Sequence, residues 1–547
     1  MYKVLDLFAG AGGMSLGFSQ TKKFHVAVAV EKHQYAQLTY RQNHEGTIVL
    51  DDILEITDYD AFKDKYGNFD IIVGGPPCQG FSNANRQKNH IISKNNSLVK
   101  KYVEVIENIK PMAFVMENVR MLRSDIHRFY RSEDDNLEGY ELTLKPETLC
   151  LYEGNCPVKD INKYMFNRKT VEELLLSEKS RTILRTILKG SYKEEKRNDI
   201  LRKKSKSGIK IINAIPNRSI EVSMHYRQFE QVALDKVLAY LEGRISFAEA
   251  EPHMVSYLSM QRMLSAAKEL LDNKIVIQEL RLDGTGIYVD VESFTVVDYI
   301  KEKLGKLYLI HDEVLNAAWF GAPQSRERYI ALGIRKDIAE KNGVRPRLPE
   351  QKYFSHQYRT VKDAISDLQE IEPGYDVNED KGIDISLKSY KETALTADLR
   401  NSAVLYNHIT TETRETALKR FAALKPGQNF HDLDKGLIED TYSKPERTQN
   451  SIYLRLDYEN PSGTVTNVRK SMWIHPIVDR AISIREAARL QTFPDNFIFI
   501  GTKDSQYQQV GNAVPPLMAK AIAEELAKLL EACGIEKVTT EKIAELN

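Results

Sequence analysis

The sequence has few cysteines and no long apolar run. Its 547 residues contain four cysteines, Cys78, Cys150, Cys156 and Cys533. These are too few and too scattered for a disulfide framework and favour a reducing compartment. No apolar run approaches the ~18 residues of a membrane span, and the first residues lack the charged leader and apolar core of a signal peptide. We therefore expect a cytoplasmic protein with no membrane attachment.

Net charge is absent as well. The chain has 77 lysines and arginines against 77 aspartates and glutamates, so its overall charge gives no argument for nucleic-acid binding, and any basic surface must be local. The most basic stretch is KEEKRNDILRKKSKSGIK, residues 193–210. Such a run either binds the phosphates of a nucleic acid or forms a solvated charged surface, and its charge alone does not distinguish the two.

Strands, turns and helices alternate in the first part of the chain. A short apolar run over 4–8 leads into a glycine-rich turn, and further apolar runs end near Glu31, Asp52 and the Gly/Pro turn at 74–77. A helical pattern is then stopped by Pro111, and MAFVMENV follows as another strand. This alternation predicts an α/β fold with a mostly parallel, helix-covered sheet.

Two stretches interrupt this pattern. Residues 124–292 are long polar and helical segments with one hairpin near their end, which predicts a mainly helical insertion. Residues 336–462 are turn-rich, which predicts a second, smaller domain. The α/β domain would then consist of 1–123, 293–335 and 463–547.

The glycine cluster Gly10 to Gly13 follows the first predicted strand. It matches neither the GxGxxG spacing of dinucleotide sites nor the phosphate loop, so a pyrophosphate ligand is disfavoured, and the cluster alone could be a tight turn. Glu31 and Asp52 follow the next two strands, where carboxylates can accept hydrogen bonds from ribose hydroxyls and an adenine amino group. An adenosyl ligand would satisfy both.

Cys78 lies in GGPPCQGFS, after a predicted strand. Two prolines before it and a glycine after it would hold the thiol at a loop tip, where its thiolate would be a nucleophile. Glu117 ends the next strand, so the two side chains should meet at one edge of the sheet. The alternative is an inert buried cysteine.

Arg326 and Arg328 stand two residues apart in PQSRERY. In an extended segment they would point to the same face and could grip a carbonyl oxygen or a phosphate. The alternative is a surface salt-bridge run. Cys150 and Cys156 have no second pair, so we expect no metal site.

Six motifs follow one another in the chain: DLFAGAGG, GGPPCQGFS, MENV, QSRER, REAARLQTFPDNF and QVGNAVPP. In this order they resemble the cytosine-5 DNA methyltransferases that use S-adenosylmethionine, of the bacterial restriction-modification type. The likeness runs from the first residues to about Leu530, with gaps at the insertion and at the variable region. It implies a Rossmann-like class I methyltransferase domain with a target recognition domain at 336–462.

The resemblance also implies roles for individual residues. Cys78 would attack carbon 6 of cytosine, Glu117 would bind the exocyclic amine and ring nitrogen 3, and Arg328, with Arg326 nearby, would hold the carbonyl oxygen at position 2. The cofactor-binding residues would be Phe8, Ala9, Gly10, Gly12, Gly13, Glu31, Asp52, Pro76 and Asn512.

Methylation of a ring carbon requires the base to leave the stacked duplex. The polar loop from Gln79 to Asn96 would then close over the DNA, and the residues expected to meet the DNA there are Gln79, Ser82, Arg86 and Lys88. The partners implied are double-stranded DNA and a separately encoded restriction endonuclease, with a monomeric enzyme. Two alternatives are a cytosine-5 methyltransferase acting on RNA and a catalytically silent DNA-binding relative.

Overall fold

A computed structural model describes residues 1–77, 96–135, 137–215, 223–386, 388–438 and 445–535 of the chain. Their fold divides into two compact units. The first is built from residues 1–77, 97–123 and 303–535, and the second from residue 96 and residues 124–302. None of the described helices combines the length and hydrophobicity needed to cross a membrane.

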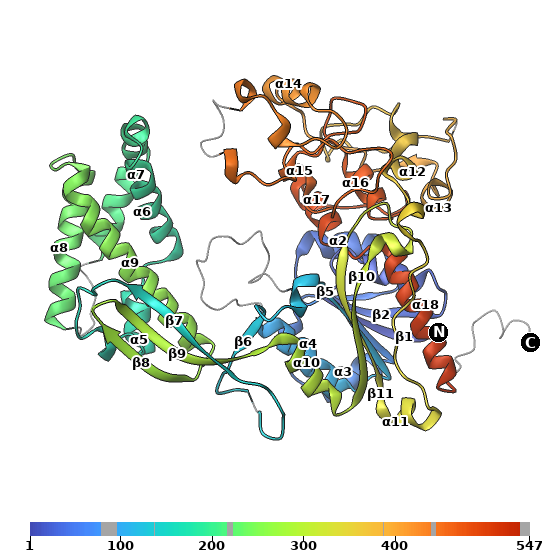
Figure 1. Ribbon diagram of the computed structural model, residues 1–547, viewed down its shortest axis with the longest axis horizontal. Coiled ribbons are helices and arrows are strands. Elements are labelled where there is room, and N and C mark those ends of the chain that lie inside the picture. The colour runs from blue at the N-terminus through green and yellow to red at the C-terminus, as the bar shows by residue number, and fades with distance from the viewer. Residues whose placement is uncertain (78–95, 136, 216–222, 387, 439–444, 536–547) are drawn as a thin grey trace, which may run out of the picture. The chain divides into compact units, whose positions relative to one another are not determined.

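A seven-stranded sheet forms the centre of the first unit, with strand order β10-β11-β5-β4-β1-β2-β3 (Figure 1). β5, β4, β1, β2 and β3 run parallel, whereas β11 pairs antiparallel with both β5 and β10. The strand bounds are β1 Tyr2–Leu7, β2 Phe24–Val30, β3 Ile48–Leu50, β4 Ile71–Gly74, β5 Ala113–Val119, β10 Tyr308–Asn316 and β11 Glu327–Arg335. The predicted mostly parallel α/β sheet is confirmed.

Helices cover both faces of this sheet, which is why its central strands are continuous apolar runs. α1 (Gly13–Ser19) and α18 (Pro516–Ala532) pack on the face that carries Ile71 and Val73. α4 (Asn96–Ile109) lies against the other face, where the Tyr102 ring is 3.0 Å from the position a Cβ of Gly74 would take. The first unit also contains α2 (Gln34–Asn43) and α3 (Tyr59–Tyr66), whereas α10 (Val296–Gly305) spans the boundary between the two units.

The turn-rich segment 336–462 belongs to the first unit. The sequence predicts a domain of its own there, but the structure keeps the segment in the same compact unit as the sheet because buried polar contacts join it to the C-terminal residues. Its elements, with those that follow, are α11 Lys336–Ala339, α12 Val361–Ile365, β12 Ile383–Asp384, α13 Thr396–Leu399, β13 Val404–Leu405, α14 Glu415–Ala423, α15 Val468–Ser471, α16 Ile484–Leu490 and α17 Lys503–Asn512.

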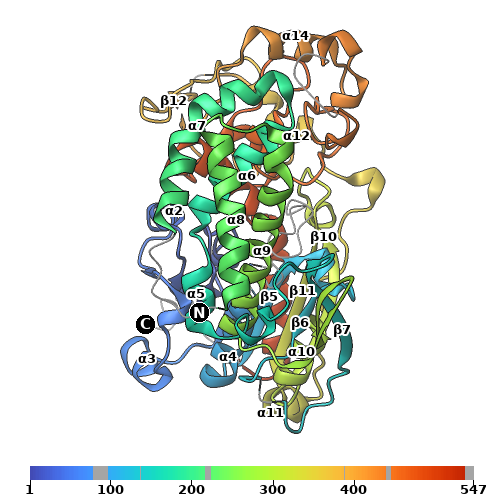
Figure 2. The same ribbon diagram turned by 90° about the vertical axis from the view of Figure 1, so that its left-hand side faces the viewer.

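The second unit combines an antiparallel sheet with a group of helices (Figure 2). The sheet order is β6-β9-β7, and β8 also pairs with β9. The predicted hairpin is confirmed as β8–β9, whereas the sequence reading missed the strands before the helices. The bounds are β6 Arg128–Tyr130, β7 Lys145–Glu153, α5 Arg168–Leu174, α6 Glu178–Ser191, α7 Glu194–Ala214, α8 Met224–Leu241, α9 Phe247–Asp272, β8 Ile277–Asp283 and β9 Gly286–Thr295.

Candidate functional site

The glycine turn after β1 is open on one side and closely packed on the other. Gly10 has a φ of 57°, and a Cβ built there would meet no atom within 4 Å. Gly12 has a φ of 95°, and a Cβ there would lie 2.1 Å from the His44 ring. Phe8 also has a positive φ of 61°. The turn therefore needs glycine for two reasons: a left-handed backbone and close packing.

Two carboxylates follow the ends of β2 and β3, and one of them, Glu31, contacts this turn. Glu31 accepts hydrogen bonds from the backbone N–H of Gly10 at 2.9 Å and of His33 at 2.6 Å. Burial raises the pKa of Glu31. Asp52 pairs with Lys32 at 2.6 Å. Burial acts to raise the pKa of Asp52, but the hydrogen bonds from Lys32 and Leu54 lower it below its usual value.

The other residues of the predicted cofactor set lie on the segments next to the turn. The Ala9 N–H donates to the Val30 carbonyl at 3.0 Å. A Cβ on Gly13 would lie 2.5 Å from the Val514 carbonyl oxygen, in the segment that follows Asn512. Asn512 is exposed, and its Oδ1 accepts from Gln508 at 2.8 Å. The turn and the QVGNAVPP motif, far apart in sequence, are therefore neighbours.

A buried carboxyl lies beneath the turn, and the sequence reading missed it. Asp6 of β1 accepts a hydrogen bond from Ser15 of α1, whose hydroxyl accepts in turn from Tyr40 at 2.7 Å. Burial raises the pKa of Asp6 to about 7, although the Ser15 hydrogen bond acts in the opposite direction. The available signal was one acidic residue between the apolar residues Leu5 and Leu7 of β1.

Glu117 and Arg328 form an ion pair across the β5–β11 ladder. The Arg328 Nε lies 2.8 Å from the Glu117 Oε1, and the two side chains are 13% and 12% exposed. A Cβ on Gly75 would lie 2.8 Å from the other Glu117 oxygen. The Pro76 carbonyl accepts from Asn118 at 2.8 Å. The Gly/Pro loop after β4 is thereby held directly against the Glu117 carboxylate.

Arg326 and Arg328 have different partners. The terminal nitrogens of Arg326 donate to the backbone oxygens of Val465 at 2.8 Å and Gly511 at 3.0 Å, and its side chain is fully buried. Burial lowers its pKa, with a further lowering from the nearby Arg328 charge. The geometry thus supports a positioning role for Arg326: it fastens the start of β11 to two later segments.

Gln324 strengthens this connection. Its amide nitrogen donates to the Leu490 carbonyl at 2.9 Å and to the Gln491 side chain at 2.7 Å, and its oxygen accepts from the Val465 N–H at 3.1 Å. Gln491 in turn donates to the Val510 carbonyl at 2.7 Å. The motifs QSRER, REAARLQTFPDNF and QVGNAVPP therefore meet in one buried hydrogen-bonded cluster.

Several predicted site residues lie outside the described residues: Cys78, Gln79, Ser82, Arg86 and Lys88. What the structure does place is the backbone that precedes Cys78, through Gly75 and Pro76. Within the described ranges, no three histidine, cysteine or acidic side chains are grouped so that they could hold a metal ion.

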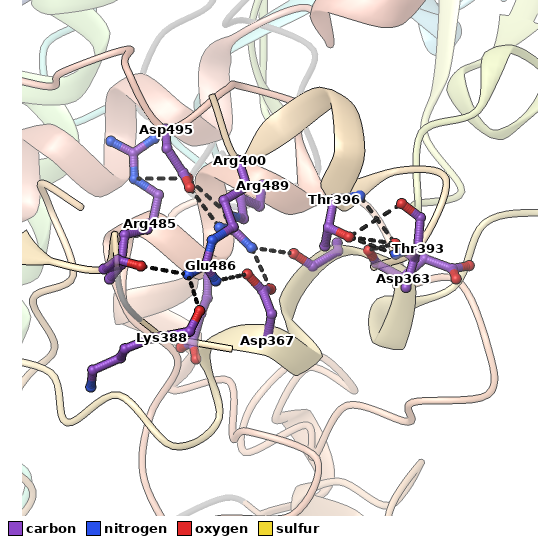
Figure 3. Close-up of polar contacts among 12 residues, drawn as sticks. Asp363, Asp367, Lys388, Thr393, Thr396, Arg400, Arg485, Glu486, Arg489 and Asp495 are labelled. Atoms are coloured by element: carbon purple, nitrogen blue, oxygen red, sulfur yellow. Dashed lines mark hydrogen bonds and ion pairs between the residues drawn. The ribbon is translucent and has the colours of Figure 1, made fainter. Parts of the chain in front are cut away.

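A buried ion network joins α16 to the segment 336–462 (Figure 3). Arg489 makes two hydrogen bonds to Asp495, at 2.9 and 2.6 Å, and pairs with Asp367 at 2.5 Å. Asp367 also pairs with Arg400 at 3.0 Å. Arg489, Asp495 and Asp367 have fully buried side chains. This network provides the physical reason why 336–462 stays in the first unit.

The described geometry can be compared with known proteins. The C-5 cytosine-specific DNA methylase family matches residues 2–135 and 292–528 of this chain, and the match omits most of the insertion. The type II methyltransferase M.DdeI of Desulfomicrobium norvegicum is 25% identical over 96% of this chain and 89% of its own length. The DNA (cytosine-5-)-methyltransferase M.ApeKI of Aeropyrum pernix is 25% identical over 97% of this chain and 99% of its own length.

One solved structure shows the same fold. A candidate DNA modification methyltransferase encoded within an Escherichia coli prophage superposes with a TM-score of 0.53 at 18% identity, and covers 97% of this chain and 100% of that chain. This likeness agrees with a Rossmann-like class I methyltransferase fold.

The raised pKa of Asp6 predicts a pH-dependent stability. Between pH 3.8 and about 7 the folded state keeps a proton on Asp6 that the unfolded chain releases, so stability falls as pH rises through this window and is flat below it. From pH 5 to pH 8 the loss from Asp6 is about 2–3 kcal/mol. Unfolding by urea, followed by the fluorescence of Trp319 and Trp473, reports on the first unit alone because both tryptophans lie there. The Asp6→Asn variant should lack this loss, and identical pH profiles for both proteins would refute the prediction.

The ion network predicts a large cost for removing Arg489. Arg489→Met removes the two hydrogen bonds to Asp495 and leaves that buried carboxylate with the more distant Arg485, at 3.9 Å, as its ion-pair partner. Such a loss costs on the order of 3–5 kcal/mol. The matched control is Lys362→Met, because Lys362 pairs with Glu459 at 3.3 Å and these side chains are 55% and 74% exposed; its cost should stay within ~1 kcal/mol. Tryptophan fluorescence during urea unfolding measures both, and equal costs would show that the network contributes no more than a surface pair.

Proposed function

This chain belongs to the C-5 cytosine-specific DNA methylase family, and from that membership we propose that it transfers a methyl group from S-adenosylmethionine to carbon 5 of a cytosine within a specific sequence of duplex DNA. The observation that carries the proposal is the Glu117–Arg328 pair, held beside the loop that leads to Cys78. The name of the M.ApeKI relative, a DNA (cytosine-5-)-methyltransferase, and the family's description as a DNA methylase support DNA over RNA as the substrate.

The residues at the glycine turn fit an adenosyl cofactor. The space above Gly10 is open, so a ligand can approach the backbone closely. Glu31 and Asp52 present carboxylate oxygens at the ends of neighbouring strands, and these can accept hydrogen bonds from ribose hydroxyls and from an adenine amino group. S-adenosylmethionine bound there would supply an electrophilic methyl group. Phe8, Ala9, Gly12, Gly13, Pro76 and Asn512 complete the proposed binding set.

The chain's own residues then activate the cytosine ring. Carbon 5 is a poor nucleophile, and addition of the Cys78 thiolate to carbon 6 makes it electron-rich. Glu117 protonates ring nitrogen 3 and accepts a hydrogen bond from the exocyclic amine, while Arg328 holds the carbonyl oxygen. Carbon 5 then takes the methyl group and leaves the sulfonium donor as a thioether. A base, water or hydroxide, removes the proton from carbon 5. The electron pair left there forms the double bond between carbons 5 and 6, and the bond from carbon 6 to sulfur breaks to give back the Cys78 thiolate. Ring nitrogen 3 returns its proton to Glu117. The Arg328 guanidinium also holds the Glu117 carboxylate in position, and Arg326 supports both by fixing the start of β11.

The target base must leave the duplex to reach Glu117. We assign the loop 79–96, with Gln79, Ser82, Arg86 and Lys88, to contacts with the DNA beside the flipped base, and segment 336–462 to reading the sequence in a groove. A restriction endonuclease encoded elsewhere and a monomeric state remain predictions from the resemblance.

Methylation in cells tests the activity directly. Genomic DNA from a methylation-free bacterial strain that expresses this chain should show protected cytosines within one short recurring sequence after bisulfite sequencing. The Cys78→Ser variant should show none, because a serine hydroxyl is a far weaker nucleophile than a thiolate. Substantial protection in the serine variant would refute the covalent mechanism.

Measurements on the purified enzyme separate the effect of a substitution on the methylation rate from its effect on cofactor binding. Glu117→Gln should lower the methylation rate by about 10²–10⁴-fold, the usual contribution of a general acid, with a smaller effect on cofactor affinity. Glu313→Gln makes the same chemical change at an exposed residue of β10 and should leave the rate unchanged. A Glu117→Gln rate close to that of the control would refute the assigned role.

An exchange of segment 336–462 tests the recognition assignment. Replacing it with the corresponding region of a relative of different specificity should change the methylated sequence to that of the donor, because base-edge contacts specify the site. Bisulfite sequencing reads the outcome. An unchanged target sequence would place recognition elsewhere in the chain.

A further inference from the structure

The insertion separates its charges by sign. Residues 178–214, which form α6, α7 and the turn between them, contain twelve lysines and arginines against four aspartates and glutamates. The rest of residues 124–302 contains sixteen lysines and arginines against twenty-five aspartates and glutamates. A merely solvated surface mixes both signs, whereas a segregated positive surface is the electrostatic signature of a nucleic-acid contact.

α6 and α7 form a firmly packed hairpin. Leu184 and Ile187 of α6 and Ile212 of α7 are buried in one apolar cluster. Gly208 lets α7 pack closely, since a Cβ there would lie 2.8 Å from Leu241. At the turn, the Arg197 Nε donates to the Ser191 carbonyl at 2.9 Å. The outward face of the hairpin is therefore presented by a rigid element.

Three lysines occupy the outward face of α7. Lys203, Lys206 and Lys210 are exposed, and their i, i+3, i+7 spacing places them in one stripe opposite Ile212. Lys203 pairs with Asp199 at 2.7 Å. Within the described part of the chain, no ion pair joins Lys206 or Lys210 to an acidic residue. The stripe is thus only partly neutralised by the protein itself.

The length of the stripe suits a phosphate backbone. Seven residues of helix span about 10 Å at ~1.5 Å each, and one DNA strand presents a phosphate for every ~3.4 Å of helix axis, so about three fall within this length. Lysine places a hydrated point charge on a flexible stem and has no fixed geometry for reading a base. Such a stripe can therefore bind the backbone independently of sequence.

We propose that the α6–α7 hairpin is a second DNA-binding surface, which binds phosphates of duplex DNA without regard to base sequence through Lys203, Lys206 and Lys210. The proposal rests on the proposed function, because it takes duplex DNA as the substrate. The family match does not extend to this part of the chain, so the surface adds to the contacts assigned to the first unit. Its effect is to raise affinity for DNA outside the target sequence.

The test compares two triple variants of the full chain. The hairpin variant carries glutamine, which has a helix propensity similar to that of lysine, at Lys203, Lys206 and Lys210. The control variant carries glutamine at three exposed lysines of the same unit outside the hairpin, Lys159, Lys163 and Lys236. Binding to a fluorescent duplex of roughly four helical turns, or about 40 base pairs, is measured at several salt concentrations. The slope of log K against log salt should fall by about 2–3 for the hairpin variant, at ~0.9 per lost phosphate contact, and by about 0.9 for Lys206→Gln alone. The control slope should not change.

Equal slopes for the parent, the hairpin variant and the control would overturn the proposal, and so would an equal fall in both triple variants, because net charge alone would then explain it. A competition experiment with unlabelled duplexes tests the choice of DNA as the ligand. If duplex RNA displaces the labelled DNA from the hairpin better than duplex DNA does, that choice is overturned. Bisulfite sequencing of the parent is scored separately. A parent that binds with the expected slopes but methylates nothing would refute the proposed function and leave the hairpin assignment standing.

Discussion

The antiparallel pairing of β11 with β5 is the constraint on which the candidate site depends. In this register Arg328 lies opposite Val119, and Ile330 opposite Glu117, so the cation and the carboxylate share one face of the sheet. A slip of one residue would turn Arg328 to the other face. The register is held by more than the ladder itself, because Gln324 and Arg326 fasten the start of β11 to backbone segments from the C-terminal part of the chain.

Buried charge has a structural use in this protein. The ion pairs of Arg489 and the hydrogen bonds of Arg326 each give a guanidinium several oxygen partners, which is how buried arginines offset the loss of water. The Arg326 Nε is the exception, since it is buried with no hydrogen-bond partner among the described residues. An apolar interface would tolerate many packings, whereas these donors fit only one arrangement of acceptors. The segment 336–462 is thereby tied to the sheet that carries Glu117, although the two are remote in sequence.

The local parts of this structure were predictable, and the long-range parts were not. Apolar runs and Gly/Pro turns predicted β1, β4 and β5, and the position of Glu117 at a strand end followed from them. The Asp6–Ser15–Tyr40 chain, the partners of Arg326 and the place of 336–462 within the first unit depend on contacts between distant segments, which no local pattern encodes. In the insertion, the helices and the hairpin were predicted, whereas β6 and β7 were missed because they pair with β9 across more than a hundred residues.

The packing of α18 on α1 has a consequence for how the chain is made. A Cβ on Gly17 would lie 2.5 Å from Ala519, so the two helices touch closely although some five hundred residues separate them, and α18 supplies much of the apolar layer beneath the sheet. During synthesis on a ribosome, the N-terminal strands must wait until some five hundred further residues have been made before that layer is closed. The second unit, drawn almost entirely from one continuous stretch, can fold while the rest is still being translated.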